Sequence, residues 1–204
     1  MNYKIHSFRH GEIILNNEPS YKSVWHELLG AISSMSDEKI IEYHEKTKAM
    51  SISKAINNLL KDKLVALNWN AESSIFQNDE YSGNRWRLDF AKSSISVEVA
   101  FNHGEAIAWN LIKPVLAGEL NHVKKEINTE IGVIICATKE LKDSGGFDGS
   151  VGEYEKFLTY LDPLRDVLSV PMVIIGLEAP KTFKIDVRKI DGKNQGIVQS
   201  IKKD

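Results

Sequence analysis

Two acidic residues, Asp89 and Glu98, stand on either side of a short polar turn at Lys92-Ser93. Residues 85–91 and 94–102 each have the composition of a β-strand, so we expect an antiparallel hairpin that turns at this pair. In the second strand, the two-residue period of side chains sets Glu98 on the face of the small polar residues, away from the apolar ones. A hairpin of this kind can bring Asp89 beside Glu98.

A pair of converging carboxylates has a specific chemistry. The two charges repel each other unless a cation lies between them. Oxygen-only ligation suits Mg²⁺, which takes one or two protein carboxylates together with water and phosphate oxygens. A bound Mg²⁺ polarises a phosphodiester, activates water near neutral pH and stabilises the leaving oxygen. The pair therefore indicates phosphodiester hydrolysis, although the same spacing also fits solvated acids or acids ion-paired with Arg85, Arg87 or Lys92.

The rest of the chain alternates between helical and strand-like patterns. Apolar residues at helical spacing predict helices over residues 19–35, 51–67, 104–125 and 154–168, the last of them broken near Pro163. Residues 37–48 fit either a helix or a loop. Strand patterns cover residues 3–8, 74–77, 131–137, 170–177 and 183–187, and a loop rich in Gly and Ser covers residues 143–152. This order of elements is typical of an α/β or α+β protein with helices against the faces of a sheet.

The composition excludes several classes of protein. A length of 204 residues with 42% hydrophobic residues fits one globular domain with a sizeable core. The formal net charge of -2 argues against binding of nucleic acid by net charge alone. The single cysteine, Cys136, excludes an internal disulfide and a Cys-rich zinc site, and it lies in an apolar run typical of a core. No stretch approaches the roughly 20 apolar residues of a membrane span, so we expect a cytoplasmic protein with no membrane partner.

The run Asp89…Glu98-Val99-Ala100 resembles the PD-(D/E)XK motif. Its nine-residue offset is similar to that of the BglII/BstYI group of type II restriction endonucleases, which belongs with the BamHI-like enzymes. Three further segments resemble this group, namely residues 45–48, 98–109 and 170–176. The resemblance thus extends over most of residues 1–180.

This resemblance implies a fold, a cofactor and a substrate. The fold is restriction-endonuclease-like, with a mixed central β-sheet flanked by helices in a single nuclease domain over residues 1–204. The cofactor is Mg²⁺ and the substrate is double-stranded DNA, hydrolysed by a metal-activated water. Asp89 and Glu98 match the catalytic, metal-binding acids of the group, and the Val99 carbonyl matches its backbone metal ligand.

Ala100 departs from the pattern of the group, which has Lys, Gln or Glu at this third motif position. A methyl group cannot orient the attacking water or act as a base. Either another side chain or a metal-bound water fills that role, or the enzyme is slow or inactive. Glu72, which precedes the hairpin, and Glu105, in the first turn of the next helix, are candidate substitutes. Glu105 also fits as an acid favoured near a helix N-terminus by the helix dipole.

Two segments match positions where the resembling enzymes contact bases. Asn102 and His103 follow the catalytic strand, and Asn can pair with adenine while an imidazole can donate to guanine N7 or O6. His103 also fits as a helix-capping or phosphate-contacting residue. Asp143, Ser144 and Gly145 resemble the second major-groove loop of the group, and the alternative is a surface loop that makes no contact.

The long helix over residues 104–125 resembles the dimerisation helix of the group. It implies a homodimer whose two-fold symmetry matches a palindromic site. By resemblance, the site is a six-base palindrome centred on GATC that is cut to leave 5′ overhangs, and a cognate DNA methyltransferase is the expected genetic partner. Two alternatives remain, a protein of this fold that binds DNA without cutting it, as Ala100 suggests, and a small-molecule or protein-interaction domain with an incidental acidic pair.

Overall fold

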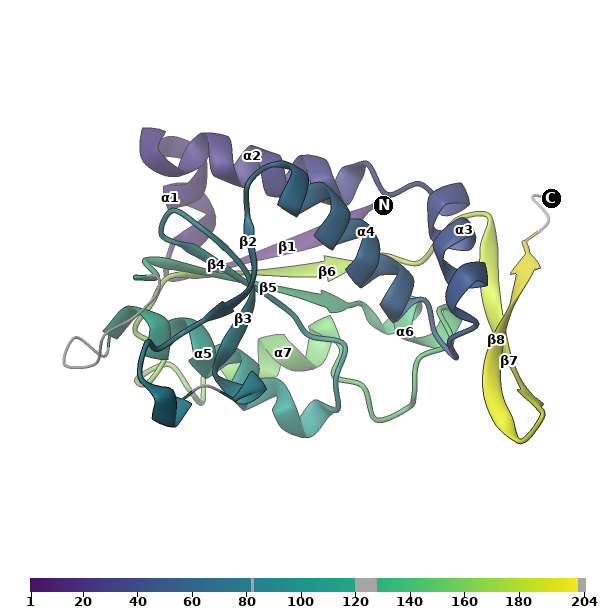
Figure 1. Cartoon of the computed structure of the whole chain (residues 1–204). Helices are drawn as coiled ribbons and strands as arrows, with labels where there is room; N and C mark the ends of the chain where they lie inside the picture. The colour runs from purple at the N-terminus through teal and green to yellow at the C-terminus, as the bar shows by residue number, and fades with distance from the viewer. Residues whose placement is uncertain (82, 120–127, 202–204) are drawn as a thin grey trace.

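The computed structural model of the chain describes residues 1–81, 83–119 and 128–201. Its centre is a sheet built from β1 (Tyr3–Phe8), β2 (Asn70–Ser74), β3 (Arg87–Lys92), β4 (Ile95–Val99), β5 (Ile131–Ala137) and β6 (Met172–Leu177). The six strands lie in the order β1-β6-β5-β4-β3-β2 (Figure 1). β4, β5 and β6 are parallel, whereas β1, β2 and β3 pair antiparallel with their neighbours. The expected mixed sheet is therefore confirmed.

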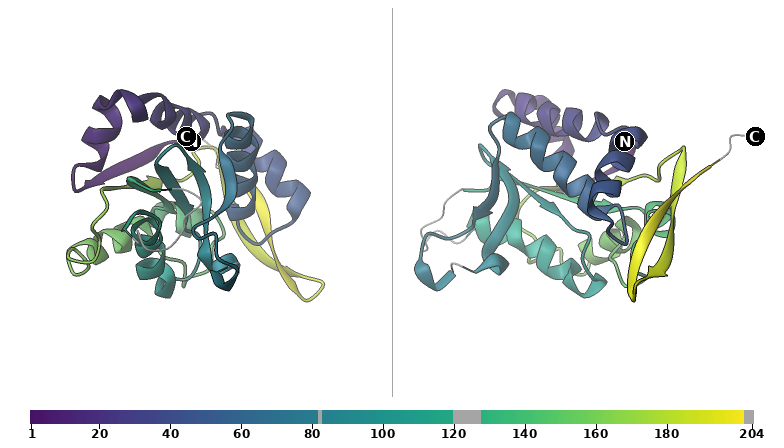
Figure 2. Two further views of the ribbon diagram at one scale, coloured as in Figure 1. Left: turned by 60° about the vertical axis from the view of Figure 1, so that its left-hand side comes forward. Right: turned by 45° about the vertical axis from the view of Figure 1, so that its right-hand side comes forward.

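Helices cover both faces of this sheet (Figures 1 and 2). One layer holds α1 (Gly11–Asn17), α2 (Pro19–Ser33), α3 (Asp37–Thr47) and α4 (Ser53–Ala66), and the other holds α5 (Ile107–Glu119) and α7 (Tyr154–Leu161). Along β5, Val133 and Ile135 pack with the first layer, while Ile134 and Cys136 pack with the second. All of β5 is buried, as expected for a strand covered on both faces. None of the helices among the described residues is long and apolar enough to cross a membrane.

β3 and β4 form the predicted hairpin, but its turn lies one residue later than the expected Lys92-Ser93. Phe90 pairs with Val97, and Lys92 pairs with Ile95, which leaves Ser93 and Ser94 in the turn. Ser93 has a positive φ of 53°, as tight hairpin turns require. β2 adds a third strand on the other edge of β3, where Ala71 pairs with Phe90.

Helix α5 packs closely against β5. A Cβ atom on Gly132 would lie 2.6 Å from Cβ of Pro114, so the glycine makes the room in which Pro114 sits on the sheet. The chain stays helical through Pro114, and a 3₁₀ turn at Gly104–Ala106 precedes the helix. Residues 120–125 of the expected helix lie outside the described residues.

Two local expectations were wrong in their bounds. The first part of the predicted loop at 143–152 belongs to α6 (Lys139–Ser144), whose N-terminus is capped by the Thr138 side chain accepting from the Leu141 N–H. The strand expected at 74–77 is β2, which ends at Ser74. Helix α7 ends at Leu161, in agreement with the break expected near Pro163, which cannot continue the backbone hydrogen bonds of a helix.

The C-terminal part of the chain forms a hairpin of β7 (Phe183–Ile190) and β8 (Lys193–Ser200), separate from the main sheet. The expected edge strand at 183–187 was too short, and β8 was not predicted. Asp191 and Gly192 connect the strands with φ values of 50° and 78°. Phe183 and Ile185 join the main core cluster, which anchors the hairpin to the body of the protein.

Candidate active site

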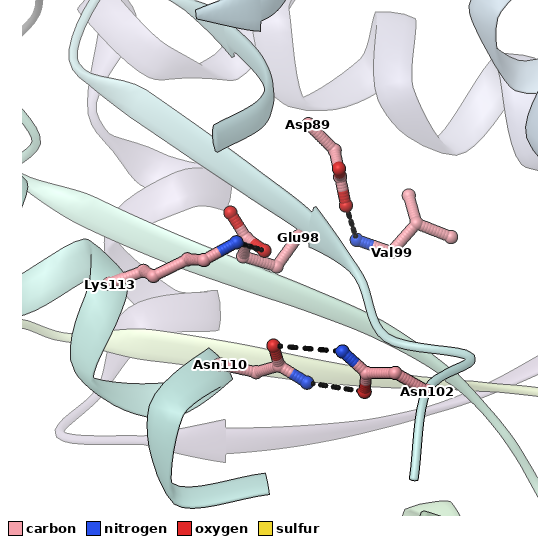
Figure 3. Close-up of polar contacts among 6 residues, drawn as sticks. All are labelled: Asp89, Glu98, Val99, Asn102, Asn110 and Lys113. Carbon is pink, nitrogen blue, oxygen red and sulfur yellow. Dashed lines mark hydrogen bonds and ion pairs between the residues drawn. The ribbon is translucent and has the colours of Figure 1, made fainter. Parts of the chain in front are cut away.

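Asp89 of β3 and Glu98 of β4 occupy facing positions of the hairpin. Because Phe90 pairs with Val97, the same register sets Asp89 opposite Glu98. The negative charge of Asp89 contributes to a raised pKa of Glu98, so the two carboxylates are close enough to repel each other. The structure therefore brings together the two acids that the sequence pattern selected (Figure 3).

Asp89 is fixed by the backbone of the neighbouring strand. The Val99 N–H donates a hydrogen bond of 2.6 Å to Oδ2 of Asp89 (Figure 3). Burial raises the pKa of Asp89 above its ordinary value, while this hydrogen bond and the positive charge of Lys113 act in the opposite direction. The bond holds one oxygen of Asp89 against β4, at the residue that follows Glu98.

Glu98 is buried, with an exposed fraction of 3%. Its Oε2 forms an ion pair of 2.7 Å with Nζ of Lys113, whereas its Oε1 is buried and has no hydrogen-bond partner among the described residues. Burial, and then repulsion by Asp89, raise the pKa of Glu98 to about 8, although Lys113 lowers it. The positive charge of Lys113 therefore does not offset the free-energy cost of burying the Glu98 carboxylate beside that of Asp89.

Lys113 is a site residue that the sequence analysis did not select. It extends from α5 to Glu98, and its side chain has an exposed fraction of 11% (Figure 3). The sequence carries one signal for it, because Lys113 is the single charged residue between positions 107 and 118. A lone charge in an otherwise apolar helix commonly has a buried partner.

Glu72 of β2 continues the row of acids across the sheet. The register between β2 and β3 sets it opposite Asp89, and its charge contributes to the raised pKa of Asp89. Glu72 is exposed, however, and has a positive φ of 54°. Within the described residues, no group of three or more His, Cys, Asp or Glu side chains is placed to hold a metal ion. Glu72 therefore lies near the pair without completing a three-carboxylate site.

The other two positions near the motif have different surroundings. Ala100 is buried in an apolar cluster with Ile107, Leu111 and Ile134. Glu105 is exposed in the 3₁₀ turn and lines a cavity of about 500 Å³ together with Arg85, Trp86, Ala106 and Trp109. Glu105 thus lies beside an aromatic surface, and no contact joins it to the acidic pair.

Asn102 follows β4 and is held by the helix. The amides of Asn102 and Asn110 form two reciprocal hydrogen bonds, of 2.9 Å from Asn110 Nδ2 and 3.4 Å from Asn102 Nδ2 (Figure 3). Asn110 is buried, with an exposed fraction of 2%, whereas Asn102 is exposed. The pair fixes the direction in which the chain leaves the hairpin.

His103 is joined to the loop that follows α6. Its Nδ1 lies 2.9 Å from Oγ of Ser150, which also donates a 2.5 Å hydrogen bond to Asp148. The Gly104 N–H donates to the Ser150 carbonyl at 2.7 Å. Hydrogen bonds from Ser150 are the main cause of the lowered pKa of Asp148. His103, Asp148 and Ser150 therefore form one exposed polar cluster, of which the sequence analysis selected only His103.

The segment expected to make a second set of base contacts, residues 143–145, lies at the C-terminal end of α6. Asp143 and Ser144 form the last turn of α6, and the Ser144 hydroxyl donates to the Glu140 carbonyl. Gly145 is buried, its N–H donates to Leu141 and its carbonyl accepts from the Ile52 N–H. Through these hydrogen bonds, Gly145 has a structural role at the end of α6. The exposed part of the loop begins at Asp148.

Comparisons with known proteins agree with this geometry. No curated protein sequence matches the chain. Its structure is similar to a crystal structure of restriction endonuclease BglII complexed with a DNA 16-mer, with a TM-score of 0.68, 20% sequence identity and coverage of 98% of this chain and 100% of that one. Free BglII is similar at a TM-score of 0.59 and 18% identity, with the same coverage. The profile of the restriction endonuclease BglII/BglIII family matches residues 3–177, a range that includes the whole central sheet and the acidic pair. The chain belongs to the restriction endonuclease BglII/BglIII family.

Proposed function

We propose that this protein is a Mg²⁺-dependent endonuclease that hydrolyses phosphodiesters of double-stranded DNA at a short palindromic site. The observation that carries the proposal is the buried pair of Asp89 and Glu98 in a chain of this family. Two facing carboxylates in a partly buried site need a positive charge between them. A divalent cation with oxygen ligands meets this need.

The residues present fit such a cation. Oε1 of Glu98 is buried and has no partner in the part of the chain that the structure describes, so it is an oxygen in need of a ligand. Asp89 would supply a second carboxylate, and the Val99 carbonyl, which accepts from the Phe101 N–H at 3.2 Å, keeps a second lone pair. When bound, Mg²⁺ would activate water and stabilise negative charge on the phosphate. The chain itself fixes Asp89 through the Val99 N–H, so that the acid is oriented before the cation arrives.

The polar residues beside this pair fit the reading of DNA. A similar protein, BglII, has been crystallised in complex with DNA. In this chain, exposed Asn102 and His103 leave the hairpin directly after the acidic pair, and Asp148 and Ser150 extend the same polar surface. These side chains can donate to and accept from base edges in a major groove. Asp143 and Ser144 remain candidates for contacts at the end of α6.

The proposal includes a homodimer and a genetic partner. A palindromic site requires two-fold symmetry of the protein, for which α5 is the proposed interface helix. A GATC-centred site with 5′ overhangs is the proposed specificity. A nuclease of this kind would cut the DNA of its own cell, so we propose a cognate DNA methyltransferase as its partner.

Plasmid cleavage tests the proposed function. We expect discrete fragments from the wild type with Mg²⁺, none with EDTA, and none from Asp89→Ala or Glu98→Gln. The matched control is Glu42→Gln, which removes an exposed acid paired with Lys46 at 2.6 Å on α3 and should cut like the wild type. Equal cleavage by Asp89→Ala and wild type would contradict the proposal.

Ala100 favours a second candidate function, binding of palindromic DNA without cleavage. Its methyl group lies in an apolar cluster and cannot orient water. The same assay separates the two candidates when it is combined with a gel-shift measurement. A specific band shift with Ca²⁺ or Mg²⁺ and no fragments would favour the binding protein.

A further inference from the structure

The third motif position of this chain holds no group that can take part in hydrolysis. The side chain of Ala100 is a methyl group with an exposed fraction of 2%, packed against α5 residues Ile107 and Leu111. Ala100 and Glu98 lie on the same face of β4, because side chains alternate along a strand. That face is covered by α5, so a replacement for the missing group can come from the helix.

Lys113 of α5 occupies a suitable place. Its Nζ lies 2.7 Å from Oε2 of Glu98, and it is also the positive charge that acts on Asp89. The position of this lysine is fixed by the packing of the helix, since the neighbouring residue, Pro114, sits in the space over Gly132 of β5. Gly132 in turn pairs with Ser96, two residues before Glu98.

We propose that Lys113 is a catalytic residue that replaces the third motif side chain. This inference rests on the proposed function. With DNA bound, the ammonium group of Lys113 donates a hydrogen bond to a non-bridging oxygen of the scissile phosphate and stabilises the charge that this oxygen gains as water attacks phosphorus and the bond to the leaving oxygen breaks. The attacking water loses its proton to solvent, the electron pair of the broken bond stays on the leaving oxygen, and that oxygen takes a proton from solvent. No proton leaves the lysine in this step. Without DNA and metal, the same ammonium group rests on Glu98 and partly neutralises it.

A purely structural ion pair would have different consequences. If Lys113 only ties α5 to the sheet, its removal lowers stability and affects metal binding and cleavage in the same direction. If Lys113 acts on the phosphate and is not needed to hold α5 on the sheet, the two carboxylates keep their places when it is removed. They are then free for a cation, because a competing positive charge is gone. Metal affinity and cleavage then change in opposite directions.

The experiment compares Lys113→Met, Lys113→Arg and a control, Lys92→Met. Lys92 also forms a partly buried pair, at 2.6 Å with Glu27 of α2, but it lies at the turn end of the hairpin. Mn²⁺ binding to the DNA-free protein is measured by calorimetry, cleavage by single-turnover assay with Mg²⁺, and folding by thermal melting followed by circular dichroism.

We expect Lys113→Met to slow cleavage about 100-fold or more, the usual effect of losing one charged donor to a transition state. It should bind Mn²⁺ about 3- to 10-fold more tightly than the wild type, since a nearby like charge is removed. Lys113→Arg keeps the charge and should cleave faster than Lys113→Met. Lys92→Met should match the wild type in both measurements.

Two results would overturn the role of Lys113. One is cleavage by Lys113→Met within a few-fold of the wild type, which leaves the nuclease function intact. The other is weaker Mn²⁺ binding together with lost cleavage. Should Lys113→Met not fold, Lys113→Gln takes its place. Lost cleavage with Mn²⁺ binding at least as tight as that of the wild type then supports the role of Lys113, and cleavage within a few-fold of the wild type contradicts it. A wild type that neither binds Mn²⁺ nor cuts DNA would instead overturn the proposed function, and the role of Lys113 with it.

Discussion

The carboxylate of Asp89 accepts a 2.6 Å hydrogen bond from the backbone N–H of Val99, across the hairpin of β3 and β4. This bond joins one proposed metal ligand to the residue whose carbonyl is a second one. The bond lies within the folded chain and holds Asp89 against β4, at the residue next to Glu98 (Figure 3). Asp89 therefore has a structural and a chemical role that different substitutions can separate.

Replacement of Asp89 by Asn keeps an oxygen that can accept from the Val99 N–H and removes the charge. We expect Asp89→Asn to lose cleavage while it remains about as stable as the wild type. Asp89→Ala leaves the Val99 N–H without its partner, which should cost about 1–3 kcal/mol of unfolding free energy. Urea unfolding in EDTA measures this difference. Equal stability of the alanine and asparagine variants would show that the hydrogen bond contributes little.

The raised pKa of Glu98 predicts how stability depends on pH. Its pKa in the metal-free protein is about 8, compared with an ordinary value of 4.5. Folding therefore favours the protonated carboxyl, so the contribution of Glu98 to stability is fully present below about pH 4.5 and is lost as the pH rises through about 8. Relative to Glu98→Gln, which cannot titrate, the unfolding free energy of the wild type should fall between about pH 5 and pH 9.

Urea unfolding of both proteins in EDTA at several pH values checks this expectation. The two curves should diverge with rising pH, and parallel curves would mean that Glu98 does not titrate in this range. Added Mg²⁺ should stabilise the wild type more at pH 9 than at pH 6, because a cation binds the ionised carboxylate. In Glu98→Gln, the stabilisation by Mg²⁺ should not increase between pH 6 and pH 9.

The close packing of α5 on β5 gives a third prediction. In Gly132→Ala, the new Cβ would lie 2.6 Å from Pro114, so the helix must shift away from the sheet. We expect a loss of about 1–3 kcal/mol in unfolding free energy. Cleavage should fall as well, because Lys113 would move relative to Glu98. The control is Gly30→Ala on α2, whose new Cβ would meet nothing within 4 Å, and similar losses in both variants would contradict the packing argument.

His103 gives a prediction about specificity. It is exposed and linked to Ser150 and Asp148, so His103→Ala removes a polar group from the proposed DNA-reading surface. We expect binding to the cognate site to weaken by about 1–3 kcal/mol, with little change for unrelated DNA. Competition gel shifts at fixed salt measure the ratio of the affinities for the cognate site and for unrelated DNA. An equal loss on both DNAs would identify His103 as a phosphate contact instead.

The hairpin could be predicted from the sequence because the residues that determine it are close together in the chain. Asp89 and Glu98 lie in two strands separated by one tight turn, so alternation alone sets their faces. Lys113 could not be predicted in the same way. Its contact with Glu98 depends on how α5 packs on β5, which is decided by the small size of Gly132 and not by the residues around Lys113. The lone charge in an apolar helix was the one local signal for it.

The C-terminal hairpin illustrates a second limit. Strand β8 is largely polar and lacks a clear alternation, so no strand was predicted there. Asp191-Gly192 was an available signal, since this dipeptide favours the tight turns of hairpins. At α6, the cap at Thr138 was the signal for a helix, but the glycines that follow concealed it. In both places, short elements depend on the side chains they contact in the folded protein.

The central claim is that Asp89 and Glu98 hold one divalent cation at a DNA phosphate. Crystals of the protein grown with DNA and Mn²⁺ test it most directly through an anomalous difference map. We predict one manganese peak per protomer between the two carboxylates, beside the Val99 carbonyl and a phosphate oxygen, with Lys113 turned from Glu98 to the phosphate. A map without a peak at this pair, with the ion pair of Glu98 and Lys113 intact beside bound DNA, would contradict the account.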